Sequence, residues 1–118
     1  MLSPILIAST DSTRHLLVMT VEGPMVDPSH VEPLRMVLPA VPAEHSLIVD
    51  LSGATNFSAA SIEALRSVAQ AAVHQGQVMI VVCGDLDRRT ELVLADLDTL
   101  VPVVAAVEQA LPLTQAAA

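Results

Sequence analysis

The sequence predicts an α/β fold built on a mixed, mostly parallel sheet of about four to five strands, with about four helices. Three observations predict it. Short apolar runs of strand length recur between helical patterns along the chain. The first two runs are separated by a turn signal, whereas the later runs are separated by helices. One unit reads strand, helix, glycine and strand, the order of a right-handed crossover between parallel strands.

The first two strands are predicted to pair antiparallel. The apolar run 5–8 follows Pro4, which suits the start of a strand. Asp11 and Ser12 form a turn, so the second strand, residues 15–21, folds back beside the first. The Glu-Gly-Pro stretch at 22–24 is predicted to end that strand.

A first helix is predicted after this turn. Asp27 can cap it, and Pro28 fits the first helical position. Its apolar residues share one face, until the prolines at 39 and 42 end the helix. These residues are Val31, Leu34, Val37 and Leu38.

The middle of the chain predicts the crossover unit. Residues 47–51 are apolar on both faces and indicate a central strand. A polar loop over 52–56 leads to a helix over 58–74, and Gly76 is its predicted C-cap glycine. Residues 78–83 form the next strand. The buried stripe of the helix is predicted to be Ile62, Leu65, Ala69, Ala72 and Val73.

The remaining chain predicts shorter elements. A third helix covers 85–97, a short edge strand 101–104 and a last helix 105–111, and the tail 116–118 is predicted to fray. Asp85 and Asp87 read as capping residues, and Asp96 and Asp98 as turn residues. At 118 residues the chain has the length of one domain, predicted to span 1–118.

Composition restricts the function classes. The chain has a net charge of −8, with no lysine and five arginines, which argues against binding nucleic acid or an anionic membrane. No apolar run reaches the length that spans a bilayer, and residues 1–4 lack the features of a secretory signal, so a cytoplasmic protein without membrane insertion is predicted. Cys83 cannot form an internal disulfide and is expected to be a buried small hydrophobe.

No enzyme motif is present. The chain lacks a Gly-x-Ser-x-Gly motif and a glycine-rich phosphate loop, and its four histidines show no metal-ligand spacing. The sequence leaves open a Ser-His-Asp site formed by residues that are distant in the sequence and close in the fold, although no motif supports one. The prediction is a non-enzyme that needs no cofactor and no metal.

The strand-loop-helix region beginning at residue 46 resembles the sulfate transporter and anti-sigma factor antagonist (STAS) domains. Their pattern here is roughly D-L-S-G-V-T-x-I-D-S-S-G-L-x-A-L. An ungapped alignment matches Asp50, Leu51, Ser52, Gly53, Thr55, Ala64 and Leu65. Residues 16–34 resemble the family's strand, turn and helix, with one extra residue between Gly23 and Asp27. The family ending is similar at Leu97, Asp98, Leu100, Pro102, Val103, Val107, Ala110 and Leu111.

The resemblance departs at the residues that carry regulation. The family's Asp-Ser-Ser-Gly falls on residues 58–61, and its phosphoacceptor serine falls on Ala60. Ser58 and Ser61 are the possible displaced acceptors. The resemblance implies a partner-binding surface made of Asp27, Thr55, Asn56, Ser58, Ala59, Ala60, Ser61 and Ile62. The alternative is purely structural: Ser58 caps the helix, and Thr55 and Asn56 make turn hydrogen bonds.

The resemblance implies a non-enzymatic, anti-sigma factor antagonist-like regulator whose partner is an anti-sigma factor or kinase. Two alternatives remain. One is a STAS subunit that binds the ATPase of a lipid ABC transporter. The other is a STAS domain that holds a nucleotide or another anion at the helix N-terminus, where free N–H groups carry partial positive charge.

Overall fold

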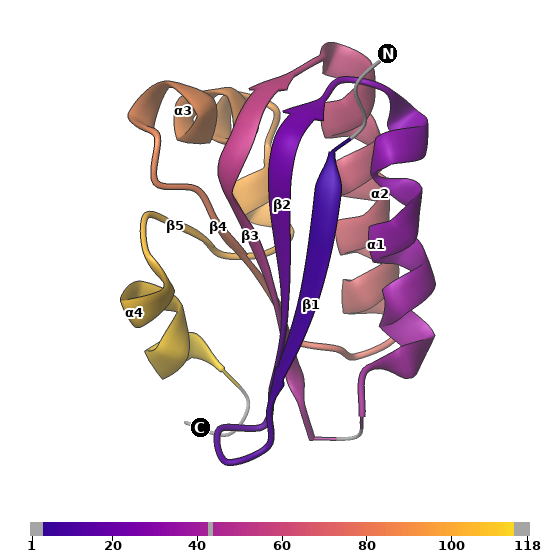
Figure 1. The fold of residues 1–118 in the computed structure, drawn as a ribbon, viewed down its shortest axis with the longest axis vertical. Helices are drawn as coiled ribbons and strands as arrows, with labels where there is room; N and C mark the ends of the chain where they lie inside the picture. Colours follow the sequence, from indigo (N-terminus) through magenta and orange to yellow (C-terminus); the bar gives the residue numbers. More distant parts are fainter. Residues whose placement is uncertain (1–3, 43, 115–118) are drawn as a thin grey trace.

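A computed structural model describes residues 4–42 and 44–114 (Figure 1). Five strands form one sheet in the order β1-β2-β3-β4-β5. β1 (Ile5–Asp11) and β2 (Leu16–Met25) pair antiparallel. β3 (Ser46–Phe57), β4 (Met79–Val82) and β5 (Val103–Val104) follow, and every pair from β2 to β5 is parallel. The predicted mixed, mostly parallel sheet is confirmed, and the tail 116–118 lies outside the described residues.

The helices cover the sheet unequally (Figure 1). α1 (Glu32–Val37) and α2 (Ala59–His74) lie on one face, and α4 (Val107–Ala110) lies on the other. α3 (Leu86–Leu94) lies beside the end of the sheet at which β3 ends. The main core fills the space between the sheet and the two helices of the first face. It includes Met25, Leu34, Leu51, Leu65 and Val81.

A smaller core lies under α4. It consists of Leu16, Ile48, Ile80, Val82 and Ala110. Adjacent residues of β4 and of the first half of β3 therefore point alternately into the two cores, which explains why residues 47–49 and 79–82 are all apolar. Cys83 is buried in the larger core, as predicted.

The first helix is shorter and more broken than predicted. Asp27 caps a 3-10 turn, η1 (Pro28–His30), before α1, and a second 3-10 turn, η2 (Leu38–Ala40), follows α1. A proline stands in the first two positions of each of these three elements, and a proline has no N–H to continue a preceding helix. Val31, Leu34 and Leu38 are nevertheless buried on one face, as predicted.

α2 has its predicted ends. Ser58 is the N-cap, and Gly76 adopts a φ of 73°, a conformation that favours glycine just after a helix. The predicted burial of Val73 in the stripe was wrong, because its side chain is 51% exposed. The buried positions of α2 recur at 61, 65, 68, 69 and 72. A side chain at 73 is rotated away from that face by the helical repeat.

β2 and β3 are longer than predicted. The predictions of a turn at 22–24 and of a polar loop at 52–56 were wrong, since both segments continue as paired strands. Gly23 has a φ of 101°, and the register shifts on both sides of it, between Thr20 and Glu22 and between Gly23 and Met25. These irregularities let the two polar segments stay paired despite a composition that suggests a loop.

The C-terminal elements are shorter than predicted. α3 ends at Leu94, not at residue 97, because Asp96 adopts the left-handed conformation with a φ of 63°. A 3-10 turn, η3 (Leu97–Thr99), follows it. β5 has two residues, and the last helix is divided into α4 and the 3-10 turn η4 (Leu111–Leu113).

The close pairing of β2 with β3 depends on Gly53. A Cβ at this position would lie 3.0 Å from the Val21 carbonyl oxygen and 3.0 Å from the Glu22 Cγ. We expect Gly53→Ala to lower the free energy of unfolding by about 1–3 kcal/mol, because a backbone atom must move. Gly84→Ala is the matched control, since its Cβ would lie no closer than 3.4 Å to a neighbour. Equal urea denaturation midpoints for both variants would contradict this explanation.

Candidate functional site

The predicted site residues gather at the end of the sheet where the parallel strands end. Here β2 ends at Met25, β3 ends at Phe57, and α2 begins directly afterwards. Asp27 lies just beyond β2, and η1 packs against α2. In open α/β sheets this end of the strands is the usual place for binding sites. The structure therefore brings Asp27 to the same end of the sheet as site residues that come 28 or more positions later in the sequence.

The start of α2 is fixed by two serines. The Ser61 N–H donates to Ser58 Oγ at 3.0 Å, and the Ser58 N–H donates to Ser61 Oγ at 2.9 Å. This reciprocal pair is a capping box, which satisfies free N–H groups at a helix start. The Ser58 hydroxyl also donates to the Val26 carbonyl and so ties the end of β2 to α2. The capping part of the structural interpretation is confirmed.

The side chains around this cap differ in exposure. Ala59 and Ala60 are exposed in the first turn, whereas Ser61 is fully buried. Thr55 and Asn56 are exposed on β3, and a hydrogen bond joins Thr55 Oγ1 to Asn56 Oδ1 at 3.2 Å. They lie on a strand and not in the predicted loop.

Asp27 is exposed beside the cap of α2. Its carboxylate accepts a hydrogen bond from the Ser29 N–H at 2.8 Å. Hydrogen bonding from that backbone group lowers the pKa of Asp27 below its usual value. The buried His30 completes the turn, because its Nδ1 accepts from the Asp27 N–H at 3.2 Å. The loop thus holds a carboxylate at a fixed position near α2.

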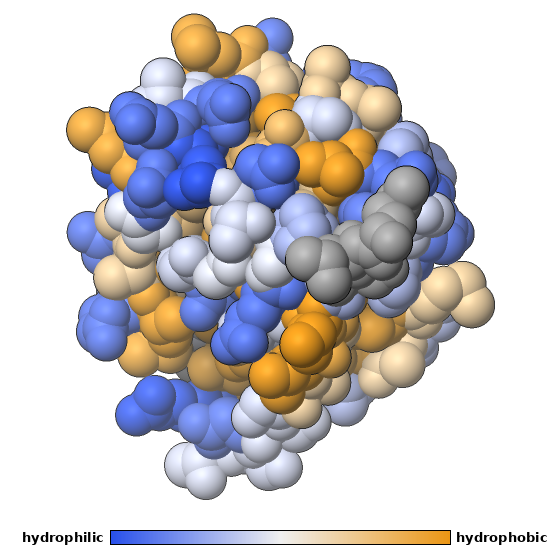
Figure 2. Space-filling view, turned by 45° about the horizontal axis from the view of Figure 1, so that its top comes forward, coloured by the Kyte–Doolittle hydropathy of each residue, from blue (hydrophilic) through white to orange (hydrophobic). Residues whose placement is uncertain are grey.

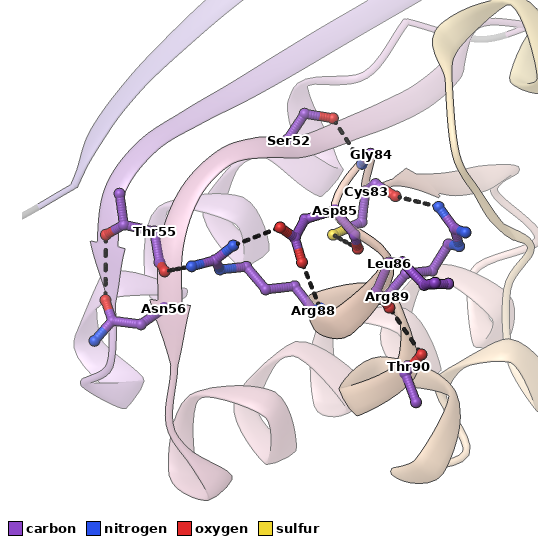
Figure 3. A network of polar contacts seen from close by, with 10 residues as sticks. All are labelled: Ser52, Thr55, Asn56, Cys83, Gly84, Asp85, Leu86, Arg88, Arg89 and Thr90. Atoms are coloured by element: carbon purple, nitrogen blue, oxygen red, sulfur yellow. Dashed lines mark hydrogen bonds and ion pairs between the residues drawn. The ribbon is translucent and has the colours of Figure 1, made fainter.

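A polar network connects β3 with α3 (Figure 3). The Arg88 guanidinium donates to the Thr55 carbonyl and forms an ion pair with Asp85 at 3.1 Å. Asp85 also caps α3 by accepting from the Arg88 N–H at 3.0 Å, which lowers the pKa of Asp85. The Gly84 N–H donates to Ser52 Oγ at 3.0 Å. These contacts hold α3 against the end of β3.

A groove of about 540 Å³ lies between α2 and α3. Its lining residues are Phe57, Ser58, Ala59, Ile62, Glu63, Glu91, Leu94 and Ala95. Leu94 is 79% exposed, and Phe57 and Ile62 are half-buried, so apolar surface faces outward. Glu63 and Glu91 add acidic groups from the two helices. Figure 2, which turns this end of the molecule forward, shows hydrophobic surface directly beside hydrophilic surface.

The sequence interpretation missed the α3 half of this site. Arg88, Glu91 and Leu94 were not among the predicted residues, although an exposed leucine three positions after a glutamate is visible in the sequence. The acid-x-x-Arg spacing from residue 85 to residue 88 was the available signal for the cap and its ion pair.

The titratable groups offer little for catalysis or metal binding. Among the residues that the structure describes, no three or more His, Cys, Asp or Glu side chains are grouped so that they could hold a metal ion. Burial raises the pKa of the Cys83 thiol, which disfavours the reactive thiolate. The rings of His15 and His45 pack edge to face, with their centroids 5.1 Å apart, and His15 is exposed.

Comparison with known proteins identifies the family. The family model for the STAS domain matches residues 7–110. The chain belongs to the STAS domain family. This match includes the end of the sheet, the capped start of α2 and the groove beside α3.

Solved structures confirm the STAS fold. An anti-sigma factor antagonist from Mycobacterium paratuberculosis has a TM-score of 0.72 and 19% identity, over 96% of this chain and 95% of that chain. A Thermotoga maritima protein assigned to the same class has a TM-score of 0.76 and 11% identity, over 93% and 94% of the two chains. The unphosphorylated anti-sigma factor antagonist SpoIIAA has a TM-score of 0.61 and 12% identity, over 90% and 94%.

Two further findings complete the comparison. No curated protein matches the chain in sequence. Within residues 4–42 and 44–114, no helix is long and apolar enough to cross a membrane.

Proposed function

We propose that this STAS domain is a non-enzymatic regulator of the anti-sigma factor antagonist type, which binds a protein partner through the exposed surface around the start of α2. The proposed surface comprises Asp27, Thr55, Asn56, Ser58, Ala59, Ala60 and Ile62, together with the groove residues Glu63, Glu91 and Leu94. Ser61 was also predicted to belong to it, but its side chain is fully buried and cannot contact a partner. The observation that supports it best is the groove itself. Exposed apolar side chains beside fixed polar groups are typical of protein-binding surfaces.

The charge of this surface favours a protein partner over a nucleotide or another anion. Glu63 and Glu91 line the groove, and Asp85 and Asp87 line the adjoining hollow beside Arg88. The positive charge of Arg88 is already paired with Asp85. An added anion would meet carboxylates, whereas a partner with apolar and basic side chains would meet complementary groups.

The proposed mode of binding is constitutive. Position 60 carries alanine, which has no hydroxyl that a kinase could phosphorylate. The two neighbouring serines are held in the capping box, and Ser61 is fully buried. A kinase would have to open the first turn of α2 to reach Ser61. Phosphorylation of a docking surface adds a dianion that disrupts binding, and this switch is proposed to be absent here.

We expect an anti-sigma-type kinase from the native host to leave this protein unmodified. Ala60→Ser should restore an acceptor, because position 60 is exposed in the first helical turn. Intact-mass spectrometry after incubation with kinase and ATP measures the gain of one phosphoryl group. Ala40→Ser is the matched control, because it adds an exposed hydroxyl on η2. A phosphoryl group on wild-type Ser58 or Ser61 would contradict the proposed absence of the switch.

The partner class is tested by affinity purification from the native lysate with the whole chain as bait. Recovery of an anti-sigma factor or anti-sigma kinase supports the proposal. Recovery of a transporter ATPase would instead favour the role of a STAS subunit in a lipid ABC transporter. In either case, binding should be lost when the α2 surface is altered.

A further inference from the structure

β1 is an edge strand that lacks the features with which proteins usually protect such an edge. The outer side of β1 faces away from β2, and no other described strand lies there (Figure 1). Its pairing with β2 is regular over all seven residues, from Ile5↔Glu22 to Asp11↔Leu16, without a bulge. An edge strand presents unpaired N–H and C=O groups, which are commonly shielded by charge, proline, a bulge or a very short strand.

Most of β1 lacks these protective features, since its one charged residue, Asp11, is the last of the strand. Residues 5–10 carry no charge and no proline. The opposite edge of the sheet is different, because β5 has only two residues and packs against α3 and α4. Within residues 4–42 and 44–114, the sheet therefore has one long open edge, and that edge is β1.

Apolar side chains extend this edge onto one face of the sheet. Ile5 and Ile7 are 62% and 49% exposed, and they alternate with Leu6, which packs against the main core. Exposed β-branched residues on a regular edge strand favour pairing with a further strand. The edge thus offers both backbone hydrogen bonds and side-chain contact area.

We infer that β1 binds a second copy of this chain by antiparallel pairing of the two β1 strands across a two-fold axis. With the axis at Ala8, the whole of β1 pairs with itself, and Ile5 lies opposite the partner's Asp11. The two copies then continue one sheet through a self-complementary interface, which is the usual form of a symmetric dimer. This inference concerns the β1 edge and not the α2 surface, and it does not depend on the proposed function.

The neutral sequence of residues 5–10 allows a second copy to occupy this edge. The chain has a net charge of −8, so two copies repel one another over most orientations. Residues 5–10 are neutral, so the paired strands place no like charges directly opposite one another. Glu22, which lies beside Ile5 on β2, is two strands from the partner's Asp11, or about 10 Å. The nearest acid, Asp11, lies within 3.8 Å of Arg14. In the paired register, the two Asp11 residues lie about 20 Å apart at 3.4 Å per residue, which exceeds the Debye length of about 8 Å.

The register places the two Ile7 side chains at diagonal positions near the axis. Diagonal residues on paired strands are close enough for long side chains to interact. Ile7→Lys would bring two ammonium groups together there while leaving β1 paired with β2. It also lowers the net negative charge, which by itself would favour association. A loss of dimer is therefore specific to this edge.

The test is sedimentation velocity of the full chain over a concentration series. The wild-type chain should show a concentration-dependent dimer, and Ile7→Lys should raise its dissociation constant at least fivefold. Val73→Lys is the matched control, because Val73 is 51% exposed on α2 and the variant has the same net charge. Thermal melts establish that both variants are folded. A wild-type chain that stays monomeric up to about 1 mM would overturn the inference, as would equal effects of the two variants.

A cysteine variant tests the register. Directly opposed residues of antiparallel strands have Cα atoms about 4.5–5.5 Å apart, which fits the range for a disulfide of about 4.4–6.8 Å. Ala8→Cys should therefore form a covalent dimer under mild oxidation. Wild-type chain, whose single Cys83 is buried, and Ala40→Cys should not. Equal cross-linking at positions 8 and 40 would overturn the proposed pairing.

Discussion

Leu65→Ala should lower the free energy of unfolding by roughly 2–5 kcal/mol, the usual range for truncation of a large core side chain. Leu65 is fully buried on α2 and belongs to the main core between that helix and the sheet. Truncation removes packed methyl groups and leaves a cavity that the rigid sheet cannot fill. Urea denaturation followed by circular dichroism measures the change.

Val73→Ala is the control for this prediction. Val73 lies on the same helix but is 51% exposed, so its truncation should change stability by about 0.5 kcal/mol or less. A loss below about 0.5 kcal/mol for Leu65→Ala would show that the face of α2 assigned to the core is wrong. Because whole domains have about 5–15 kcal/mol of stability, Leu65→Ala is unsuitable for binding experiments.

The apolar strands and the long helix were predictable because their burial follows a regular repeat. Residues 47–51 are apolar at every position except Asp50, and both faces of β3 are covered there by helices. The second half of β3 has no such pattern. Residues 52–56 are polar or small, and only pairing with the bulged end of β2 makes them a strand. Local propensity could not reveal that partner.

The start of α2 was predictable for a similar reason. A helix cap is a local interaction, and Ser58 lies directly before a helical pattern. The bond from Arg88 to the Thr55 carbonyl joins residues 33 positions apart. Its formation depends on where α3 packs, which follows from the whole sheet. The groove beside Leu94 was missed because it exists only between two helices that are placed by tertiary packing.

The early end of the third helix had a local cause that the pattern did not reveal. Apolar residues continue at helical spacing to Leu97, yet Asp96 adopts a left-handed conformation. This conformation ends α3 and rotates Leu97 into the main core. Leu94 is thereby left exposed beside the groove. The end of α3 thus supplies part of the apolar surface of the proposed binding site.

Ala60→Asp should weaken binding of a captured native partner by at least about tenfold, or about 1.4 kcal/mol. Ala60 is exposed at the second helical position of α2, in the centre of the proposed surface. A carboxylate there gains about 0.3–1 kcal/mol from the helix dipole. Repulsion from Glu63, three residues later, costs about 0.2–0.5 kcal/mol. The isolated protein should therefore keep its stability, and the loss should arise from burying an unpaired charge in the complex.

Gln70→Glu separates this effect from a change in net charge. It also adds one negative charge to the exposed face of α2, but ten residues, or about 15 Å, further along the helix. Isothermal titration calorimetry with each variant, at matched salt, measures the affinity, and thermal melts measure the fold. Binding weakened by Ala60→Asp alone, with unchanged melts, places the partner at the start of α2. Equal affinity of Ala60→Asp and the wild type would place the interface elsewhere and would contradict the proposed anti-sigma factor antagonist mode of binding.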